Sequence, residues 1–282
     1  MRYRVEVPGA GGFDCVSRAK RTDFACGDRV LIAPSAPGQA VIQAALPRTS
    51  LLYRSDAWRE KLIAANVTQA IIVTAAVPPP HQPLIDRCLV AAEHAGIRVV
   101  LVLNKSDLPQ HSAQCAALER YAGLGYPLLP LSAKRNIAPL RPALQSHLSV
   151  LVGASGVGKS TMVNALVPDA AARTAEISRA LGSGRHTTTH ARLYPLDAQS
   201  AIIDSPGLQA FGLHHIDREA LAQAFAEFRP YLGACRFRDC RHRSEPGCAV
   251  EAAAQQGKIT AWRLSLYREF ARERAGARRT AR

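Results

Sequence analysis

The chain has 282 residues, 48% of them hydrophobic, and 36 Lys and Arg against 22 Asp and Glu, a formal net charge of +14. This composition excludes a disordered chain, and the lack of an apolar run of 18 residues excludes a membrane-spanning helix. The basic excess favours a polyanion such as nucleic acid, although an arginine-rich composition that serves only solubility leaves the same signature. Without a signal-peptide pattern, and with cysteines that suit reduced thiols, we expect a cytoplasmic protein.

Residues 1–50 carry the signals of short strands, with β-branched or alternating runs separated by Gly, Pro and Asp. The runs are YRVEV, FDCVS, DRVLIA and QAVIQAAL. They predict a small antiparallel barrel of the OB type over residues 1–55. Such barrels often bind RNA. A packing module without a binding role is the alternative.

From about residue 56 the pattern changes to continuous apolar runs, which are typical of strands buried on both faces of a parallel sheet. The runs cover residues 69–76, 98–104, 147–153 and 200–204, and residues 83–95 between the first two have the pattern of a helix. Alternating strands and helices predict a doubly wound α/β domain over residues 56–213. Ligands of such sheets lie beyond the carboxyl ends of the strands.

The segment GASGVGKST follows the third of these strands and precedes a helical pattern, which is the context that a phosphate-binding loop requires. Its backbone N–H groups are expected to bind phosphates, Lys159 to reach the β- and γ-phosphates, and Ser160 to coordinate Mg²⁺. The predicted nucleotide-binding residues of this loop are Gly153, Ala154, Ser155, Gly156, Val157, Gly158, Lys159, Ser160 and Thr161. Downstream, DSPG follows the fourth strand. Asp204 is predicted to hold Mg²⁺ through water, and the Gly207 N–H to sense the γ-phosphate.

The second strand ends in NKSD, residues 104–107, the guanine-reading tetrapeptide of GTPases. Asp107 would accept hydrogen bonds from guanine N1 and N2, which adenine cannot supply. Asn104, Lys105 and Ser106 would support the loop and the base. The tripeptide Ser132, Ala133 and Lys134 follows the run PLLPL, and a backbone N–H there would bind guanine O6.

The GTPase elements therefore occur in the order NKSD, SAK, GASGVGKST, TTT and DSPG, a circular permutation of the usual order. A nucleotide site needs only the spatial arrangement, and domain termini often lie close together. With IAANVTQAIIV (63–73) and GRHTTTH (184–190), nearly the whole chain resembles the RsgA (YjeQ) family of circularly permuted GTPases. The resemblance is weakest in the first 50 residues. It implies GTP hydrolysis coupled to late maturation of the small (30S) ribosomal subunit and to release from it, with contacts to 16S-type rRNA.

The threonines of GRHTTTH stand where a GTPase places the switch threonine that closes over Mg²⁺ and the γ-phosphate. Thr188 or Thr189 is the expected ligand. The residue after DSPG is Leu208, whose apolar side chain cannot orient a water molecule. Slow intrinsic hydrolysis is therefore expected, with stimulation by the ribosomal subunit. His186 is either a polar helper or a structural residue.

Cys235, Cys240, His242 and Cys248 form the pattern C-x₄-C-x-H-x₅-C, which also matches the RsgA family. Three thiolates and one imidazole suit one structural zinc ion per chain. The arginines between the ligands, at 236, 238, 241 and 243, would contact rRNA phosphates. The last 20 residues carry seven arginines and two glutamates, and form either a solvated helix or a phosphate-contacting arm.

Together these patterns predict three parts: an OB-like barrel over 1–55, a permuted GTPase domain over 56–213 and a zinc-binding helical domain over 214–282. We expect a monomer that binds GTP and GDP with Mg²⁺, without a membrane partner. Two alternatives stay open: a GTPase that acts on another partner, and an RNA-binding module that uses nucleotide only as a structural ligand.

Overall fold

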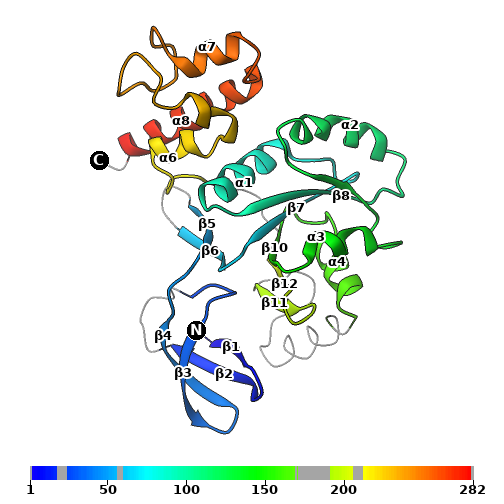
Figure 1. Ribbon diagram of the computed structural model, residues 1–282. Coiled ribbons are helices and arrows are strands. Elements are labelled where there is room, and N and C mark those ends of the chain that lie inside the picture. The colour runs from blue at the N-terminus through cyan, green and yellow to red at the C-terminus, as the bar shows by residue number, and fades with distance from the viewer. Residues whose placement is uncertain are drawn as a thin grey trace.

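A computed structural model describes residues 2–17, 24–55, 60–168, 170, 191–205 and 212–280. Figure 1 shows three parts: an N-terminal sheet, a central α/β domain and a C-terminal group of helices at the opposite end from the sheet. The central domain lies between the other two. None of the described helices has the length and apolar character needed to cross a membrane.

The N-terminal part is a sheet with the strand order β1-β2-β4-β3. Its strands are β1 (Arg2–Val7), β2 (Gly11–Ser17), β3 (Val30–Ala36) and β4 (Gln39–Ala45). β2 and β4 pair in parallel, and the other two pairs are antiparallel. Its core is small, with Cys15, Ala40 and Ile42 buried. This sheet occupies the region predicted to be the OB-like barrel.

A two-stranded antiparallel ribbon, β5 (Leu51–Ser55) with β6 (Glu60–Ala65), joins this sheet to the central domain. The sequence patterns did not predict it, because residues 51–65 lie between the strand signals of residues 1–50 and the apolar run that begins at residue 69. The two strands of the ribbon lie on either side of residue 55, where we predicted the boundary between the barrel and the GTPase domain. The position of this boundary stays a prediction. Leu52 and Ile63 of the ribbon are buried in the central core.

The central domain is built on a sheet of order β11-β12-β10-β7-β8-β9. Its strands are β7 (Gln69–Ala75), β8 (Arg98–Asn104), β9 (Leu128–Pro130), β10 (Leu148–Val152), β11 (Arg192–Pro195) and β12 (Ala201–Asp204). All pairs are parallel except β11 with β12. Every residue of β7 is buried, as expected for a central strand covered on both faces. The carboxyl ends of β8, β10 and β12 therefore meet at one edge of the sheet.

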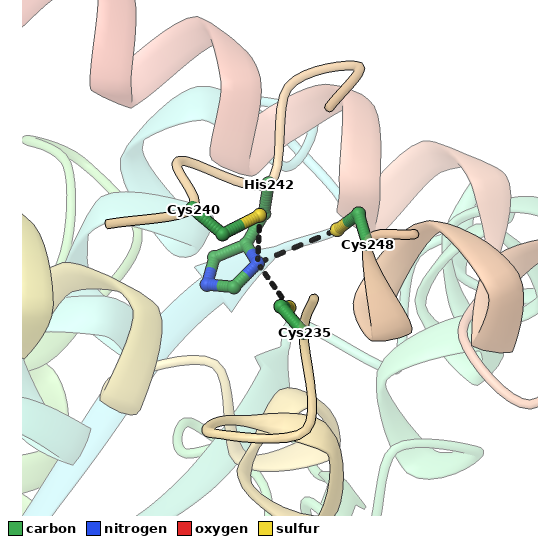
Figure 2. Close-up of side chains that lie close together, drawn as sticks. All are labelled: Cys235, Cys240, His242 and Cys248. Atoms are coloured by element: carbon green, nitrogen blue, oxygen red, sulfur yellow. Dashed lines mark hydrogen bonds between the residues drawn. The ribbon is translucent and has the colours of Figure 1, made fainter. Parts of the chain in front are cut away.

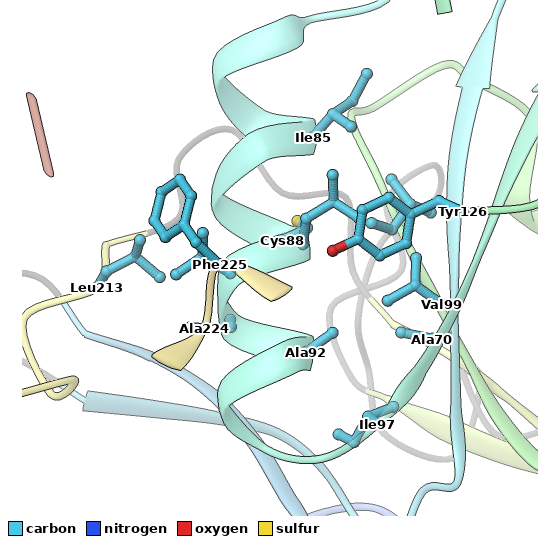
Figure 3. Close-up of a cluster of buried hydrophobic side chains, with 14 of the residues drawn as sticks. Ala70, Ile85, Cys88, Ala92, Ile97, Val99, Tyr126, Leu213, Ala224 and Phe225 are labelled. Atoms are coloured by element: carbon cyan, nitrogen blue, oxygen red, sulfur yellow. The ribbon is translucent and has the colours of Figure 1, made fainter. Parts of the chain in front are cut away.

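Helices cover both faces of this sheet, which confirms the doubly wound prediction (Figure 1). They are α1 (Gln82–His94), α2 (His111–Ala122), η1 (Ala138–Leu140), α3 (Arg141–Leu144) and α4 (Lys159–Leu166). One hydrophobic cluster lies between the sheet and α1 and continues into the C-terminal part, where Phe225 and Leu213 pack against α1 (Figure 3). The C-terminal helices thus share a core with the central domain.

The C-terminal part consists of α6 (Arg218–Gln223), η2 (Ala226–Tyr231), α7 (Ala249–Gln255) and α8 (Ala261–Thr280). The first arginine of the basic tail, Arg263, is fully buried in α8. Its Nε donates to Glu227 Oε1 at 2.5 Å, and its guanidinium lies 4.3 Å from the centre of the Phe225 ring. Arg263 is therefore part of the core, and neither prediction for the tail, a solvated helix or a phosphate-contacting arm, describes it.

Candidate functional site

The predicted guanine-reading and phosphate-binding loops meet at the carboxyl edge of the central sheet. NKSD lies at the end of β8, SAK follows β9, and GASGVGKST connects β10 to α4. Asp204 ends β12, beside β10. The fold thus brings together residues from the ends of four strands. In the sequence, the base-reading loops precede the phosphate loop.

Asn104 connects three of these loops through one buried side chain. Its Nδ2 donates to the carbonyl oxygen of Val157 in the phosphate loop at 2.9 Å, and its Oδ1 accepts from the Ala133 N–H at 3.0 Å. Only 3% of Asn104 is exposed. A buried amide with both ends paired is costly to remove, because each lost partner leaves an unsatisfied polar group. The residue predicted to support the base also fixes the position of the base loops relative to the phosphate loop.

Gly158 is the residue that allows this close approach. It has a φ of +102°, and a Cβ placed on it would lie 2.2 Å from Asn104 Nδ2. Gly158 is also the N-cap of α4, so the chain turns into the helix at the point where Asn104 touches it. A side chain at 158 would therefore collide with the amide and strain the backbone.

The side chain of Lys105 crosses from the NKSD loop to the phosphate loop. Its Nζ donates to the carbonyl oxygens of Val77, at 2.5 Å, and Gly156, at 2.8 Å. The backbone of Lys105 is left-handed, with a φ of 62°. Lys105 thus links the NKSD loop to the phosphate loop and to Val77, and its role in covering the purine face stays a prediction.

Asp107 is the carboxylate that would read guanine. The pKa of Asp107 is lowered, first by the neighbouring hydroxyl of Ser132 and further by Arg135, whose Nε lies 4.0 Å from Asp107 Oδ2. A carboxylate with a low pKa stays ionised at neutral pH and accepts hydrogen bonds only. This is the protonation state that the N1 and N2 donors of guanine require.

Lys159 and Asp204 form the buried, charged end of the site. Lys159 is 7% exposed, and its Nζ donates to the carbonyl oxygens of Gly153 and Ala154, at 2.9 Å each. An ammonium group has three donors, so one is available for a phosphate oxygen. Burial lowers the pKa of Lys159 and raises that of Asp204, while the attraction between the two charges opposes both shifts.

Asp204 and Ser160 fit a Mg²⁺ ion. The Ser160 hydroxyl donates to Asp204 Oδ2 at 3.2 Å. The other oxygen, Asp204 Oδ1, is buried and has no hydrogen-bond partner among the described residues. A hydroxyl and an unpaired carboxylate oxygen beside a phosphate loop are ligands of the kind that Mg²⁺ takes. The remaining predicted residues of this end, Thr188, Thr189 and Gly207, lie outside the described residues, as do His186 and Leu208.

A second candidate site lies in the C-terminal part, where Cys235, Cys240, His242 and Cys248 converge (Figure 2). Their ligand atoms lie within 4.8 Å of one another. His242 Nδ1 is 3.6 Å from Cys235 Sγ, 3.7 Å from Cys240 Sγ and 3.5 Å from Cys248 Sγ. A tetrahedral zinc ion with bonds of about 2.3 Å to sulfur and 2.0 Å to nitrogen would place nitrogen and sulfur about 3.5 Å apart. The cluster is therefore compatible with a tetrahedral metal ion.

Backbone N–H groups donate to two of the three sulfur atoms of this cluster. The Ala249 N–H donates to Cys235 Sγ at 3.3 Å, and the Glu251 N–H donates to Cys248 Sγ at 3.4 Å. Cys248 is the N-cap of α7, so its sulfur faces the positive end of the helix. Such donors favour thiolates, the form in which cysteine binds metals.

Comparison with known proteins identifies the family of the chain. The family model of the RsgA GTPase matches residues 45–214. The chain belongs to the RsgA GTPase family. A protein of Neisseria meningitidis serogroup B named small ribosomal subunit biogenesis GTPase RsgA is 54% identical over 275 residues, 98% of this chain and 90% of that protein.

Solved structures give the same result for the fold. The crystal structure of YjeQ from Thermotoga maritima is 32% identical, with a TM-score of 0.73 over 98% of this chain and 95% of that one. The crystal structure of YloQ, described as a circularly permuted GTPase, is 27% identical, with a TM-score of 0.69 over 98% of this chain and 91% of that one. The permuted order of the motifs is thus an RsgA family property, and GTP hydrolysis is the activity of that family.

Within this RsgA fold, some contacts of the site were not visible in the sequence. The link from Asn104 to Val157 depends on which strands are neighbours, and the bond from Lys105 to Val77 involves a loop that carries no motif. Asn104 ends β8 after five apolar residues, and this polar side chain and the NKSD motif both pointed to a role at the strand end. The Ala133 N–H, a candidate donor to guanine O6, already donates to Asn104.

Proposed function

We propose that this chain is a GTPase that binds the small (30S) ribosomal subunit and couples GTP hydrolysis to late maturation of the subunit and to its own release. The observation that carries the nucleotide part is Asn104, which holds the base-reading and phosphate-binding loops together. The ribosomal part rests on the name of the Neisseria meningitidis relative, which covers nearly the whole chain.

In the proposed complex the purine lies between the Lys105 stem and the SAK loop, with Asp107 accepting from guanine N1 and N2. Since the Ala133 N–H donates to Asn104, guanine O6 either shares that donor or takes the Lys134 N–H. The ring of N–H groups from Ala154 to Thr161 would bind the phosphates. Lys159 would place its remaining donor on the β- and γ-phosphate oxygens, where charge develops during attack by water.

The proposed cofactors are Mg²⁺ with the nucleotide and one structural zinc ion. Ser160 and Asp204, with Thr188 or Thr189, would hold Mg²⁺, which neutralises phosphate charge when bound. Gly207 would sense the γ-phosphate. The four residues Cys235, Cys240, His242 and Cys248 would hold zinc, leaving no position open for a catalytic water molecule.

The proposed partners are GTP and GDP, the small subunit and its 16S-type rRNA, with the chain acting as a monomer in the cytoplasm. The N-terminal sheet and the arginines of the cysteine loop are the surfaces proposed to contact rRNA. The N-terminal sheet and the cysteine loop flank the GTPase domain. A change of nucleotide state in that domain would therefore alter the rRNA affinity of one or both surfaces. No membrane partner is proposed.

The test is GTP hydrolysis by the purified chain, with ATP as control, alone and with small or large ribosomal subunits. We expect slow turnover of GTP alone, stimulation by the small subunit only, and no turnover of ATP. Stimulation by neither subunit would refute the ribosomal assignment. Turnover near zero in every condition would favour the non-catalytic RNA-binding alternative.

A further inference from the structure

An aromatic side chain lies on the surface of the cysteine loop. Phe237 is 44% exposed, and it is the one aromatic residue among the exposed large hydrophobic side chains of the described residues. It stands between the candidate ligands Cys235 and Cys240 and belongs to none of the hydrophobic clusters of the described residues. Exposing a phenyl ring to water is unfavourable, so packing within the chain does not explain this residue.

The backbone on both sides of Phe237 is held in place. The Cys240 N–H donates to the Phe237 carbonyl oxygen at 3.2 Å, and the Arg236 N–H donates to the Gly247 carbonyl oxygen at 3.0 Å. Gly247 has a φ of +73°, and a Cβ on it would lie 2.9 Å from Arg236 Cβ. The guanidinium of Arg236 lies 5.5 Å from the centre of the Phe237 ring. The ring is therefore presented from an ordered turn with a cation beside it.

The net charge around the ring is positive, because residues 236–245 hold four arginines against Asp239 and Glu245. Arg236, Arg238 and Arg241 are exposed, and within the described part of the chain none of them has a carboxylate oxygen within salt-bridge distance. The nearby carboxylate of Glu245 is turned toward the backbone, where it accepts from the N–H groups of Arg241, Arg243 and Ser244 at 3.0, 2.8 and 3.2 Å. An open hollow beside the ring is lined by Phe237, Asp239, Cys240, Arg241, Arg243, Ser244 and Glu245, so two arginines and two carboxylates share it.

We propose that Phe237 is a stacking platform for an unpaired RNA base, with Arg236, Arg238 and Arg241 on the flanking phosphates. Single-stranded RNA is bound through aromatic rings on its bases and cations on its backbone, whereas a duplex leaves no base face open. A protein partner would need a larger apolar patch than one ring surrounded by arginines. This proposal rests on the proposed function, which identifies rRNA as the source of the unpaired base.

The test measures binding of a 12-nucleotide single-stranded oligoadenylate and of a 12-base-pair RNA duplex, using fluorescence anisotropy. Phe237→Leu keeps an apolar side chain but removes the aromatic face, and we expect it to weaken single-strand binding about tenfold. Phe237→Trp should retain binding. Its tryptophan emission exceeds that of the wild type, and oligoadenylate should quench this additional emission. Leu193→Ala, at another exposed apolar side chain, is the matched control and should bind as wild type does.

Metal content and thermal unfolding of each variant show whether the loop is intact, since an exposed ring leaves no cavity when it is replaced. Equal single-strand affinity of Phe237→Leu and wild type, or equal affinity of the wild type for duplex and single strand, would overturn the proposal. If Phe237→Leu loses its metal, the test uses Phe237→Trp instead. Tryptophan emission that is not quenched by saturating oligoadenylate would then overturn the proposal. Failure of ribosomal subunits to stimulate the wild type would instead refute the proposed function, because the oligonucleotide assay contains no ribosome.

Discussion

The nucleotide site and the cysteine cluster are built in opposite ways. The four candidate metal ligands lie within one segment, from Cys235 to Cys248, and their atoms converge through local turns and the start of α7. The nucleotide site takes residues from the ends of β8, β9, β10 and β12, and the sheet brings them together. We therefore expect the local cluster to depend on a bound metal ion for its order, whereas the site at the sheet edge is ordered by the core beneath it.

Removal of the proposed metal ion should have the largest effect and should distinguish the two regions. Binding of a structural metal is part of the folding free energy of a small segment, and apo segments of this kind are commonly unfolded. We expect a chelator to expose residues 235–248 to proteolysis and reduce helicity at the start of α7, while GTP affinity stays within about twofold. Limited proteolysis, circular dichroism and a fluorescent GTP titration measure these effects.

The control for chelation is re-addition of zinc, which should restore the protease-resistant form. Parallel loss of GTP binding would mean that the two regions fold as one unit, through the core that Phe225 and α1 share (Figure 3). A chain that keeps its protease resistance without metal would show that the cysteine cluster is an ordinary group of packed thiols.

Lys159→Ala should have the next largest effect, confined to the nucleotide site. Loss of one preorganised donor to a developing negative charge reduces turnover by about 100- to 1000-fold. The variant also leaves the carbonyl oxygens of Gly153 and Ala154 without their lysine. Single-turnover GTP hydrolysis is the measurement, with Lys258→Ala, an exposed lysine of the C-terminal part, as control. A loss of less than about tenfold would contradict the role given to Lys159.

The same contrast decides what was predictable from the sequence. The cysteine cluster, the loop at the end of β8 and the loop between β10 and α4 were all predicted, because each is defined by residues close together in the chain. The links made by Asn104 and Lys105 were not, because they join loops whose proximity comes from the order of strands in the sheet. The burial of Arg263 was also missed, since arginine is normally exposed, and here Glu227 and the rings of Phe225 and Trp262 make its burial tolerable.

Gly158→Ala should have a moderate effect, and a second substitution should relieve part of it. The added methyl group would lie 2.2 Å from Asn104 Nδ2 and would occupy a left-handed backbone position. We expect GTP affinity to fall by at least about tenfold, since clash and strain of this kind cost about 1–3 kcal/mol. The measurement is the GTP dissociation constant of Gly158→Ala, Asn104→Ala and the double variant.

In this cycle the double variant should lose less affinity than the sum of the two single variants, because Asn104→Ala removes the group with which the methyl collides. Strict additivity would show that the collision is avoided by a shift of the loop. The result tests whether the nucleotide site is as rigid as the sheet beneath it implies, in contrast with the cysteine cluster.

Arg229→Met should have the smallest effect and tests the surface between the two regions. Arg229 Nη2 donates to Glu93 Oε2 of α1 at 2.6 Å, but the Arg229 side chain is 46% exposed and that of Glu93 18%. Partly exposed pairs of this kind contribute about 1 kcal/mol or less, and salt screens them. We expect the free energy of unfolding in urea to fall by about that amount at low ionic strength and by less in 1 M NaCl, with no change in GTP affinity.

A larger loss of stability that persists in salt, together with weaker GTP binding, would mean that this contact transmits the position of the C-terminal part through α1 to the end of β7. The nucleotide site would then depend on the helices behind the sheet as well as on the sheet itself, and the contrast between the two regions would be one of degree.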